Sequence, residues 1–258
     1  MSTVIYPSPI FGPIHSRRLG VSLGINLLPA DGKVCSFDCI YCECGYNGDH
    51  RAHQKLPTRE EVLQALETRL QDMLQNGPTP DVLTFAGNGE PTVHPDFPAI
   101  AEGVARLRDQ YFPNAKISVL SNATRLDRKE VREALLHVDN PILKLDTVDA
   151  DYISKTDRPV GHYDVADVLH WMEEMGPQII IQTMFMEGEH EGEDVGNCTP
   201  AFVDPWLEAV ARICPRQVMI YTIDRETPSP LLRKATHEQL DGIAERVREM
   251  GIPVSVSY

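Results

Sequence analysis

The sequence predicts an α/β fold for this chain, a partial (β/α)6 barrel in which parallel strands alternate with crossover helices. The main observation is that short apolar runs alternate with amphipathic stretches of helical spacing six times along the chain. A complete barrel of this architecture has eight such units, so six units leave it open. A second observation is that polar residues follow most of the apolar runs, where such barrels carry their chemistry. We expect one core domain over residues 1–258.

The apolar runs are expected to form the strands. The six strands of the barrel are predicted at 19–28, 82–86, 116–120, 141–145, 179–186 and 217–223. An N-terminal arm of about residues 1–18 precedes them, and a short C-terminal strand at about 253–258 follows the last helix.

The helices are expected between these strands, because apolar residues recur there at three- and four-residue spacing. The first helix, for example, carries Val62, Leu66, Leu70 and Met73 on one face. Capping boxes, in which a side chain at the helix start and one three residues later bond each other's backbone, are predicted at Thr58/Glu61, Asp127/Glu130 and Thr236/Gln239. Further helices are expected over 97–111 and around 165–172 and 206–213.

The charge balance indicates which partners to expect. Lysine and arginine total 24 against 38 aspartate and glutamate, a formal net charge of −14. Proteins that grip the phosphate backbone usually present a basic surface, so this balance argues against nucleic acid as a partner. No apolar stretch reaches the ~18 residues of a membrane span, and no signal peptide is evident. We therefore expect no membrane partner and a cytoplasmic location, where thiols stay reduced.

Three cysteines, Cys35, Cys39 and Cys42, lie within eight residues of one another after the first predicted strand. Thiolates are soft ligands that favour iron–sulfur clusters, zinc or copper(I). A closed site needs four such ligands, and a cubane held by only three leaves one iron open to a ligand that is not protein.

Three other interpretations of these cysteines compete. Core packing would use their shared helix face, but the flanking Asp31-Gly32 and the glycines and asparagine that follow predict a loop. A zinc site would need Cys44 as the fourth ligand, although structural zinc ligands usually come as two separated pairs. A disulfide framework suits short secreted chains, and this chain shows neither property.

The spacing of the three cysteines resembles the signature of the radical S-adenosylmethionine (SAM) superfamily, and the aromatic Tyr41 just before Cys42 also fits. The resemblance implies that Cys35, Cys39 and Cys42 bind three irons of a [4Fe–4S] cluster and that SAM chelates the fourth. It implies SAM as a partner and an electron donor such as flavodoxin or ferredoxin. The cofactors would carry the hard chemistry, while the protein positions them and excludes water and oxygen.

The turn after the second predicted strand resembles the Gly-Gly-Glu motif with which this superfamily holds the amino group of SAM. Here the residues are Gly87, Asn88, Gly89 and Glu90. Glycine permits close approach of the backbone to a ligand, and Glu90 supplies a carboxylate. Asn88 stands where the motif has glycine. That change is tolerable if backbone carbonyls hold the amino group, and whether Asn88 adds a contact is open.

Polar residues at other strand ends complete the predicted cofactor site. Lys144 and Asp146 lie two apart and therefore on one side of their strand, where they would form an ion pair or contact a ligand. A buried Gln182 would need a hydrogen-bond partner. Together with Tyr41 and the residues 87–90, the candidates for SAM binding are Ser121, Asn122, Lys144, Asp146, Gln182, Tyr221 and Ile223.

Several features have no fixed role in this prediction. The cationic set His15, Arg17 and Arg18 precedes the first strand and would suit an anionic group. The acidic run 187–194 is expected to be a solvated loop on the rim of the barrel. The remaining cysteines, Cys44, Cys198 and Cys214, show no paired spacing and are expected to be buried, inert thiols.

The segment 12–20, the turn at 88–92 and the ending at 221–228 together resemble a branch of short superfamily members grouped with the wyosine-tRNA synthetases. The resemblance implies an enzyme that cleaves SAM reductively and abstracts hydrogen from a small molecule, a peptide or a protein. Modification of a tRNA base is the alternative within the superfamily. A non-catalytic iron–sulfur or zinc module is the alternative outside it.

Overall fold

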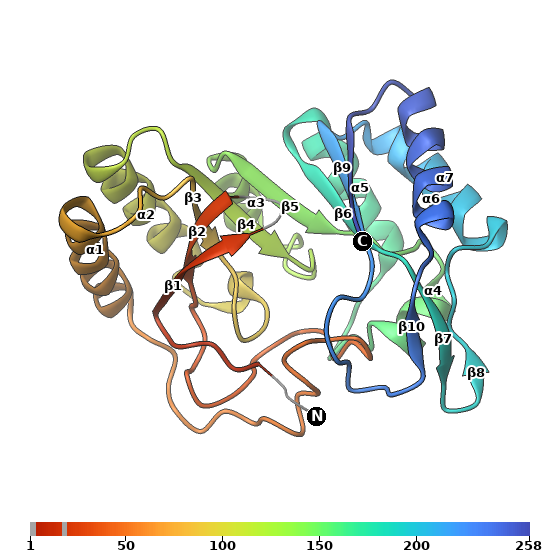
Figure 1. Ribbon diagram of the computed structural model, residues 1–258, viewed down its shortest axis with the longest axis horizontal. Helices are drawn as coiled ribbons and strands as arrows, with labels where there is room; N and C mark the ends of the chain where they lie inside the picture. Colours follow the sequence, from red (N-terminus) through yellow and green to blue (C-terminus); the bar gives the residue numbers. More distant parts are fainter. Residues whose placement is uncertain (1–3, 17–19) are drawn as a thin grey trace.

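The computed structural model describes residues 4–16 and 20–258. Within them, eight strands form one sheet in the order β1-β2-β3-β4-β5-β6-β9-β11, and all neighbouring pairs are parallel except β1 with β2. The sheet curves without closing, and helices cover its outer side (Figure 1). The bounds of its strands are β1 Ile10–Ser16, β2 Gly20–Ile25, β3 Val82–Phe85, β4 Lys116–Ser121, β5 Asn140–Lys144, β6 Ile180–Met184, β9 Gln217–Tyr221 and β11 Val254–Ser257.

The described residues confirm the predicted order of six strand–helix units, which run from β2 to α7. The helices are α1 Arg59–Asn76, α2 Phe97–Tyr111, α3 Lys129–Leu136, α4 Ala150–Thr156, α5 Val165–Met175, α6 Pro200–Ile213 and α7 His237–Glu249, with short 3-10 helices at Pro91–Val93 and Gly176–Gln178. The capping boxes at the starts of α1 and α7 form as predicted. None of the described helices is long and apolar enough to cross a membrane.

The capping prediction for α3 is wrong. The N-cap residue is Arg128, and no side chain caps the helix. Turns continue through Asp127, so the helix begins later than the pattern suggests. The short helix α4 was not predicted, because its seven residues hold too few apolar positions for a helical period to be read.

The N-terminal arm is not a simple extension of the chain. Residues 10–16 form β1, which pairs antiparallel with β2 and contains an irregularity in register between Phe11 and Ile14, around Pro13. The predicted C-terminal strand is present as β11 beside β9.

The long run predicted at 179–186 divides into two strands. Strand β6 ends at Met184, and β7, Met186–His190, belongs to a second, three-stranded sheet with β8, Glu193–Asp194, and β10, Leu232–Lys234. Phe185 lies between them, and its ring packs edge-on against Trp206 at 5.4 Å between ring centroids. This apolar anchor turns the chain toward the small sheet.

Alternate strand residues face opposite sides of the main sheet. Leu143, Ile181 and Ile220 belong to the large core between sheet and helices. Ile142, Ile180 and Met219 form a separate buried cluster on the other, inner side. By the same alternation, the residue two positions after each inner one also faces inward, at the carboxyl end of its strand. The inner end of the barrel therefore receives Lys144, Gln182 and Tyr221.

Candidate functional site

The cysteine loop is fastened to the turn after β3 by its backbone. Val34 donates to the carbonyl of Asn88 at 2.9 Å, and Glu90 donates to the carbonyl of Val34 at 3.2 Å. Gly89 makes this pairing possible, because a Cβ on it would lie 2.0 Å from the Val34 oxygen and its φ is +132°. Two predicted motifs, the three cysteines and residues 87–90, are thus brought side by side.

The far side of the loop docks on the end of α4. Asp38 and Ile40 donate their backbone N–H groups to the carbonyls of Asp157 and Thr156, each at 2.9 Å. Ser229, from the loop after β9, donates to the carbonyl of Ile40 at 3.2 Å. The loop therefore spans the open end of the barrel and is held by elements from both halves of the chain.

The three thiols lie in a partly covered apolar cluster that includes Phe37, Ile40 and Tyr41. Cys39 is buried, and Cys35 and Cys42 are half-buried. Burial and the Glu90 charge raise the pKa of Cys35 to about 12, and burial raises the pKa of Cys39 well above its usual value. A hydrogen bond from the Cys44 thiol, helped by Lys33, lowers the pKa of Cys42 to about 6.

The chemistry of the donor set suits an iron–sulfur cluster. Thiolates are soft ligands that favour such clusters. The three thiols lie on one loop in apolar surroundings, with the buried Lys33 two residues before the first of them. Within the described residues, no group of three or more His, Cys, Asp or Glu side chains forms a ready-made site for a single metal ion.

Glu90 is fully buried, and its carboxylate accepts hydrogen bonds from other residues of the chain. Its carboxylate accepts hydrogen bonds from the Thr92 backbone N–H at 3.0 Å and its hydroxyl at 2.5 Å, from the Ser121 hydroxyl at 2.9 Å and from the Asn122 backbone N–H at 2.6 Å. Burial nevertheless raises the pKa of Glu90. The side chain therefore ties the turn after β3 to the turn after β4.

Asn88, where the motif has glycine, is also fully buried and faces the N-terminal segment. Its side chain accepts from the Tyr6 N–H at 2.7 Å and donates to the carbonyls of Tyr6 and Pro29 at 2.9 and 2.8 Å. Asn26 supports the same segment by donating to the carbonyls of Tyr6 and Pro7. In this structure the Asn88 amide therefore joins Tyr6 to Pro29.

Ser121 and Asn122 lie next to the first cysteine. The Asn122 side chain donates to Ser36 Oγ at 3.0 Å and contacts Cys35 Sγ at 3.7 Å. Ser36 in turn bonds the Thr124 hydroxyl at 2.5 Å. The polar end of β4 is therefore part of the wall around the cysteines.

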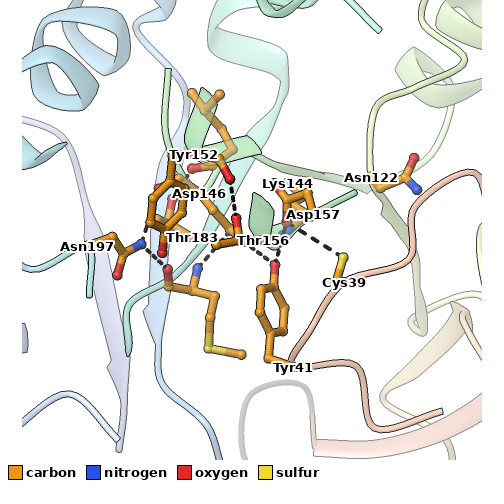
Figure 2. Close-up of polar contacts among 12 residues, drawn as sticks. Cys39, Tyr41, Asn122, Lys144, Asp146, Tyr152, Thr156, Asp157, Thr183 and Asn197 are labelled. Carbon is orange, nitrogen blue, oxygen red and sulfur yellow. Dashed lines mark hydrogen bonds and ion pairs between the residues drawn. The ribbon is translucent and has the colours of Figure 1, made fainter. Parts of the chain in front are cut away.

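A buried ionic network connects the end of β5 to Cys39 (Figure 2). The Lys144 ammonium pairs with Asp146 and with Asp157 at 2.9 Å, and lies 4.6 Å from the Tyr41 ring centre. The Tyr41 hydroxyl bonds both carboxylates, and Asp157 is 3.6 Å from Cys39 Sγ. Burial alone would lower the pKa of Lys144, but the two carboxylates outweigh it and raise that pKa. The predicted Lys144–Asp146 ion pair is present, and the sequence reading missed its second carboxylate.

The other predicted residues lie on the same inner wall. Gln182 is the sheet partner of Lys144, and Tyr221 is the partner of Met184. Both Gln182 and Tyr221 are half-buried, and Ile223 is buried in the same cluster as Tyr41. The structure thus places the predicted residues around one end of the barrel, although they reach it from six separate segments.

The unassigned features differ from expectation. The acidic run 187–194 is not a loop but the β7–β8 hairpin, with Glu189, Glu191, Glu193 and Asp194 exposed. Cys44 is buried, as expected, and contacts the Gly87 carbonyl at 3.5 Å. Cys198 is half-buried and Cys214 is exposed, so these two predictions of burial are wrong. His15 is exposed, while Arg17 and Arg18 lie outside the described residues.

Comparison with known proteins places this geometry in a family. Residues 31–195 match the family described as the radical SAM superfamily. Among curated relatives, a UPF0026 protein of Helicobacter pylori is 29% identical over 203 residues, and UPF0026 protein MJ1312 of Methanocaldococcus jannaschii is 32% identical over 181 residues. These matches cover 76% and 68% of this chain. The chain spans 62% and 53% of the two relatives' own lengths.

Solved structures share the fold at low sequence identity. A radical SAM methyltransferase from Sphaerobacter thermophilus superposes with a TM-score of 0.64 at 15% identity, over 92% of this chain and 66% of that one. TYW1 with a lysine-pyruvate adduct bound superposes with a TM-score of 0.61 at 13% identity, over 88% of this chain and 73% of that one. At this identity the likeness concerns the fold, and it agrees with the partial barrel seen here.

Proposed function

Because this chain belongs to the radical SAM superfamily, we propose that it is an enzyme that binds a [4Fe–4S] cluster through Cys35, Cys39 and Cys42 and cleaves SAM reductively. The observation that carries the proposal is the position of the cysteine loop. It lies at the carboxyl ends of the parallel strands and is paired through Val34 with the turn 87–90. When bound, such a cluster supplies the electron that splits SAM into methionine and a 5′-deoxyadenosyl radical, which then takes hydrogen from a substrate.

The protein itself is proposed to bind and orient SAM and to exclude water from the site. Glu90 fixes the turns after β3 and β4 relative to each other, so the backbone of 87–90 and the polar pair Ser121 and Asn122 stay beside Cys35. These groups are our candidates for holding the amino-acid part and the ribose of SAM. Backbone carbonyls can accept hydrogen bonds from the ammonium group of SAM. The Glu90 carboxylate, which already accepts hydrogen bonds within the protein, is not needed for this contact.

The opposite wall is the proposed place for the rest of SAM and for the substrate. It combines the ionic network of Lys144, Asp146 and Tyr41 with Gln182, Tyr221 and Ile223. Apolar cover from Phe37 and Ile40, both buried, keeps water from the thiols. We propose a small molecule, a peptide or a protein as the substrate, and a one-electron donor such as flavodoxin or ferredoxin as a partner.

Anaerobic reconstitution tests the proposal. We expect about four irons and four sulfides per chain, the content of one cubane, and slow formation of 5′-deoxyadenosine from SAM under reduction. The variant with Cys35, Cys39 and Cys42 all changed to alanine should lose the brown colour. Cys214→Ala is the matched control, because Cys214 is exposed. A cluster retained by the triple variant would refute the ligand assignment, and bound zinc in the wild type would favour a non-catalytic module.

A further inference from the structure

Lys33, two residues before the first cysteine, places an ammonium group under the cysteine loop. Its side chain is only 1% exposed. The ammonium donates to the carbonyl of Gly45 at 2.7 Å, where the loop ends, and lies 3.7 Å from the Asp38 carboxylate. The loop from residue 33 to residue 45 is therefore closed around a buried positive charge.

The nearby carboxylate leaves this charge only partly compensated. Asp38 also lies 3.9 Å from the guanidinium of Arg158 and is itself 18% exposed. Lys33, Asp38 and Arg158 therefore sum to one positive charge. Burying an ammonium without full compensation is costly, and a neutral donor would serve to bond the Gly45 carbonyl. The hydrogen bond to Gly45 alone therefore does not explain why a charged side chain is buried at this position.

The Lys33 ammonium lies against the turn that carries the third cysteine. Gly45, whose carbonyl accepts the hydrogen bond from Lys33, donates its own backbone N–H to the carbonyl of Cys42 at 2.9 Å. The other buried ammonium near the cysteines, Lys144, is more fully compensated. It is paired with two carboxylates, so its network carries a net negative charge.

We infer that Lys33 is a fixed counter-charge for the three thiolates and makes one-electron reduction of the bound cluster more favourable. The inference rests on the proposed function, since it needs the cluster on Cys35, Cys39 and Cys42. One electron enters the cluster from an external one-electron reductant, and Lys33 keeps its proton throughout. A fixed positive charge at short range favours the reduced cluster, which carries one more negative charge than the oxidised one. Lys33 is in this sense a positioning residue that acts through charge.

The test is a redox titration of the reconstituted protein with dithionite. The electron paramagnetic resonance signal of the reduced cluster is measured at each potential. Lys33→Met and Lys33→Gln remove the charge, and the glutamine keeps a donor for the Gly45 carbonyl. Lys33→Arg keeps the charge. We expect both neutral variants to shift the midpoint potential to more negative values. At a fixed poise, their ratio of reduced to oxidised cluster should fall by roughly tenfold, the order expected for one charge in a protein interior.

The controls separate charge from loop bracing. Lys33→Arg should keep a midpoint close to that of the wild type. Lys116→Met should also leave it unchanged, because Lys116 is exposed at the opposite end of the barrel. An unchanged midpoint in the neutral variants, with four irons retained, would overturn the inference while leaving the proposed function intact.

Failure to assemble the cluster is also informative. If both neutral variants fail to load iron while Lys33→Arg loads it, the charge is needed to gather the thiolates, which supports the inference. If all three variants fail to load iron, Lys33 supports the loop through the shape of its side chain and not through its charge, and the inference is wrong. A wild-type protein that binds no cluster would instead overturn the proposed function and the inference together.

Discussion

The Glu90 carboxylate accepts a 2.6 Å hydrogen bond from the backbone N–H of Asn122, across two neighbouring strand ends. A charge-assisted bond of this length between two turns fixes their spacing. Since one turn pairs with the cysteine loop and the other contacts Cys35, this single side chain sets the relative position of both.

Glu90→Ala is expected to weaken SAM binding and to lower stability while leaving the cluster in place. The change leaves buried donors of Thr92, Ser121 and Asn122 unpaired, which should cost about 3 kcal/mol or more of unfolding free energy. SAM affinity should fall roughly tenfold or more as the turns move. Iron content should persist, because backbone bonds of Val34 hold the cysteine loop.

Equilibrium binding of SAM and urea unfolding check this prediction. Glu130→Ala is the control, because Glu130 is exposed and pairs with the neighbouring Arg128 at the start of α3. Unaltered SAM affinity in Glu90→Ala would show that the turn keeps its binding geometry without the carboxylate.

The pH dependence of stability should also report Glu90. Burial raises its pKa above the usual 4.5, so the folded chain binds the proton more tightly than the unfolded chain. Stability from this group is therefore largest at low pH and declines as pH rises from about 4.5 through the folded-state pKa. Glu90→Gln has no such titration. Urea unfolding of both metal-free proteins between pH 4.5 and 8 should show the wild type losing stability relative to the variant, and parallel curves would contradict the assignment.

Asn88→Gly restores the motif of the wider superfamily and should cost stability without affecting SAM. The variant loses one bond from Tyr6 and two to the carbonyls of Tyr6 and Pro29, on the order of 2–3 kcal/mol. Asn114→Gly, in an exposed turn, is the matched control. Thermal unfolding and SAM titration distinguish the roles. A large loss of SAM affinity at normal stability would assign the Asn88 amide to the cofactor instead.

Bulk tRNA is expected not to bind tightly at physiological salt. Binding would require several phosphates to be neutralised by Lys and Arg, whereas this chain has a net charge of −14. Four exposed carboxylates of the β7–β8 hairpin follow the end of β6 and would repel phosphates brought near them. A titration of labelled tRNA at two salt concentrations measures this. Sub-micromolar binding that weakens steeply with salt would favour tRNA as the substrate.

The spacing of apolar residues was sufficient to predict the elements whose pattern is contained within a short stretch of sequence. The strands of the main sheet are apolar runs, and α1 and α7 begin at capping boxes that act over three residues. Strand β1 was missed because Gly12 and Pro13 interrupt its pattern, and its pairing with β2 depends on a register that the sequence does not reveal. The three residues of β10 are too few for any alternation to be recognised.

The candidate site was predictable where residues of one chemical type stand at a characteristic interval in the sequence. The cysteines and residues 87–90 form such motifs, and the structure brings them together. Asp157 and Lys33 belong to no such motif. The first ends a short helix, and the second lies in a loop, so only the folded chain reveals that they contact the thiols or their surroundings. The orientation of Asn88 and Glu90 was likewise beyond the sequence, because their partners are 82 and 32 residues away at most.

An open barrel has two free sheet edges, which a closed barrel lacks, and exposed edges invite strands of other molecules to add to them. Here β1 forms one edge, and Pro13 within it has no N–H to donate, beside an irregularity in register. At the other edge, β11 offers only four residues. The two edge strands of the described sheet therefore offer little to an added strand, which should limit edge-to-edge aggregation while the six central strands carry the site.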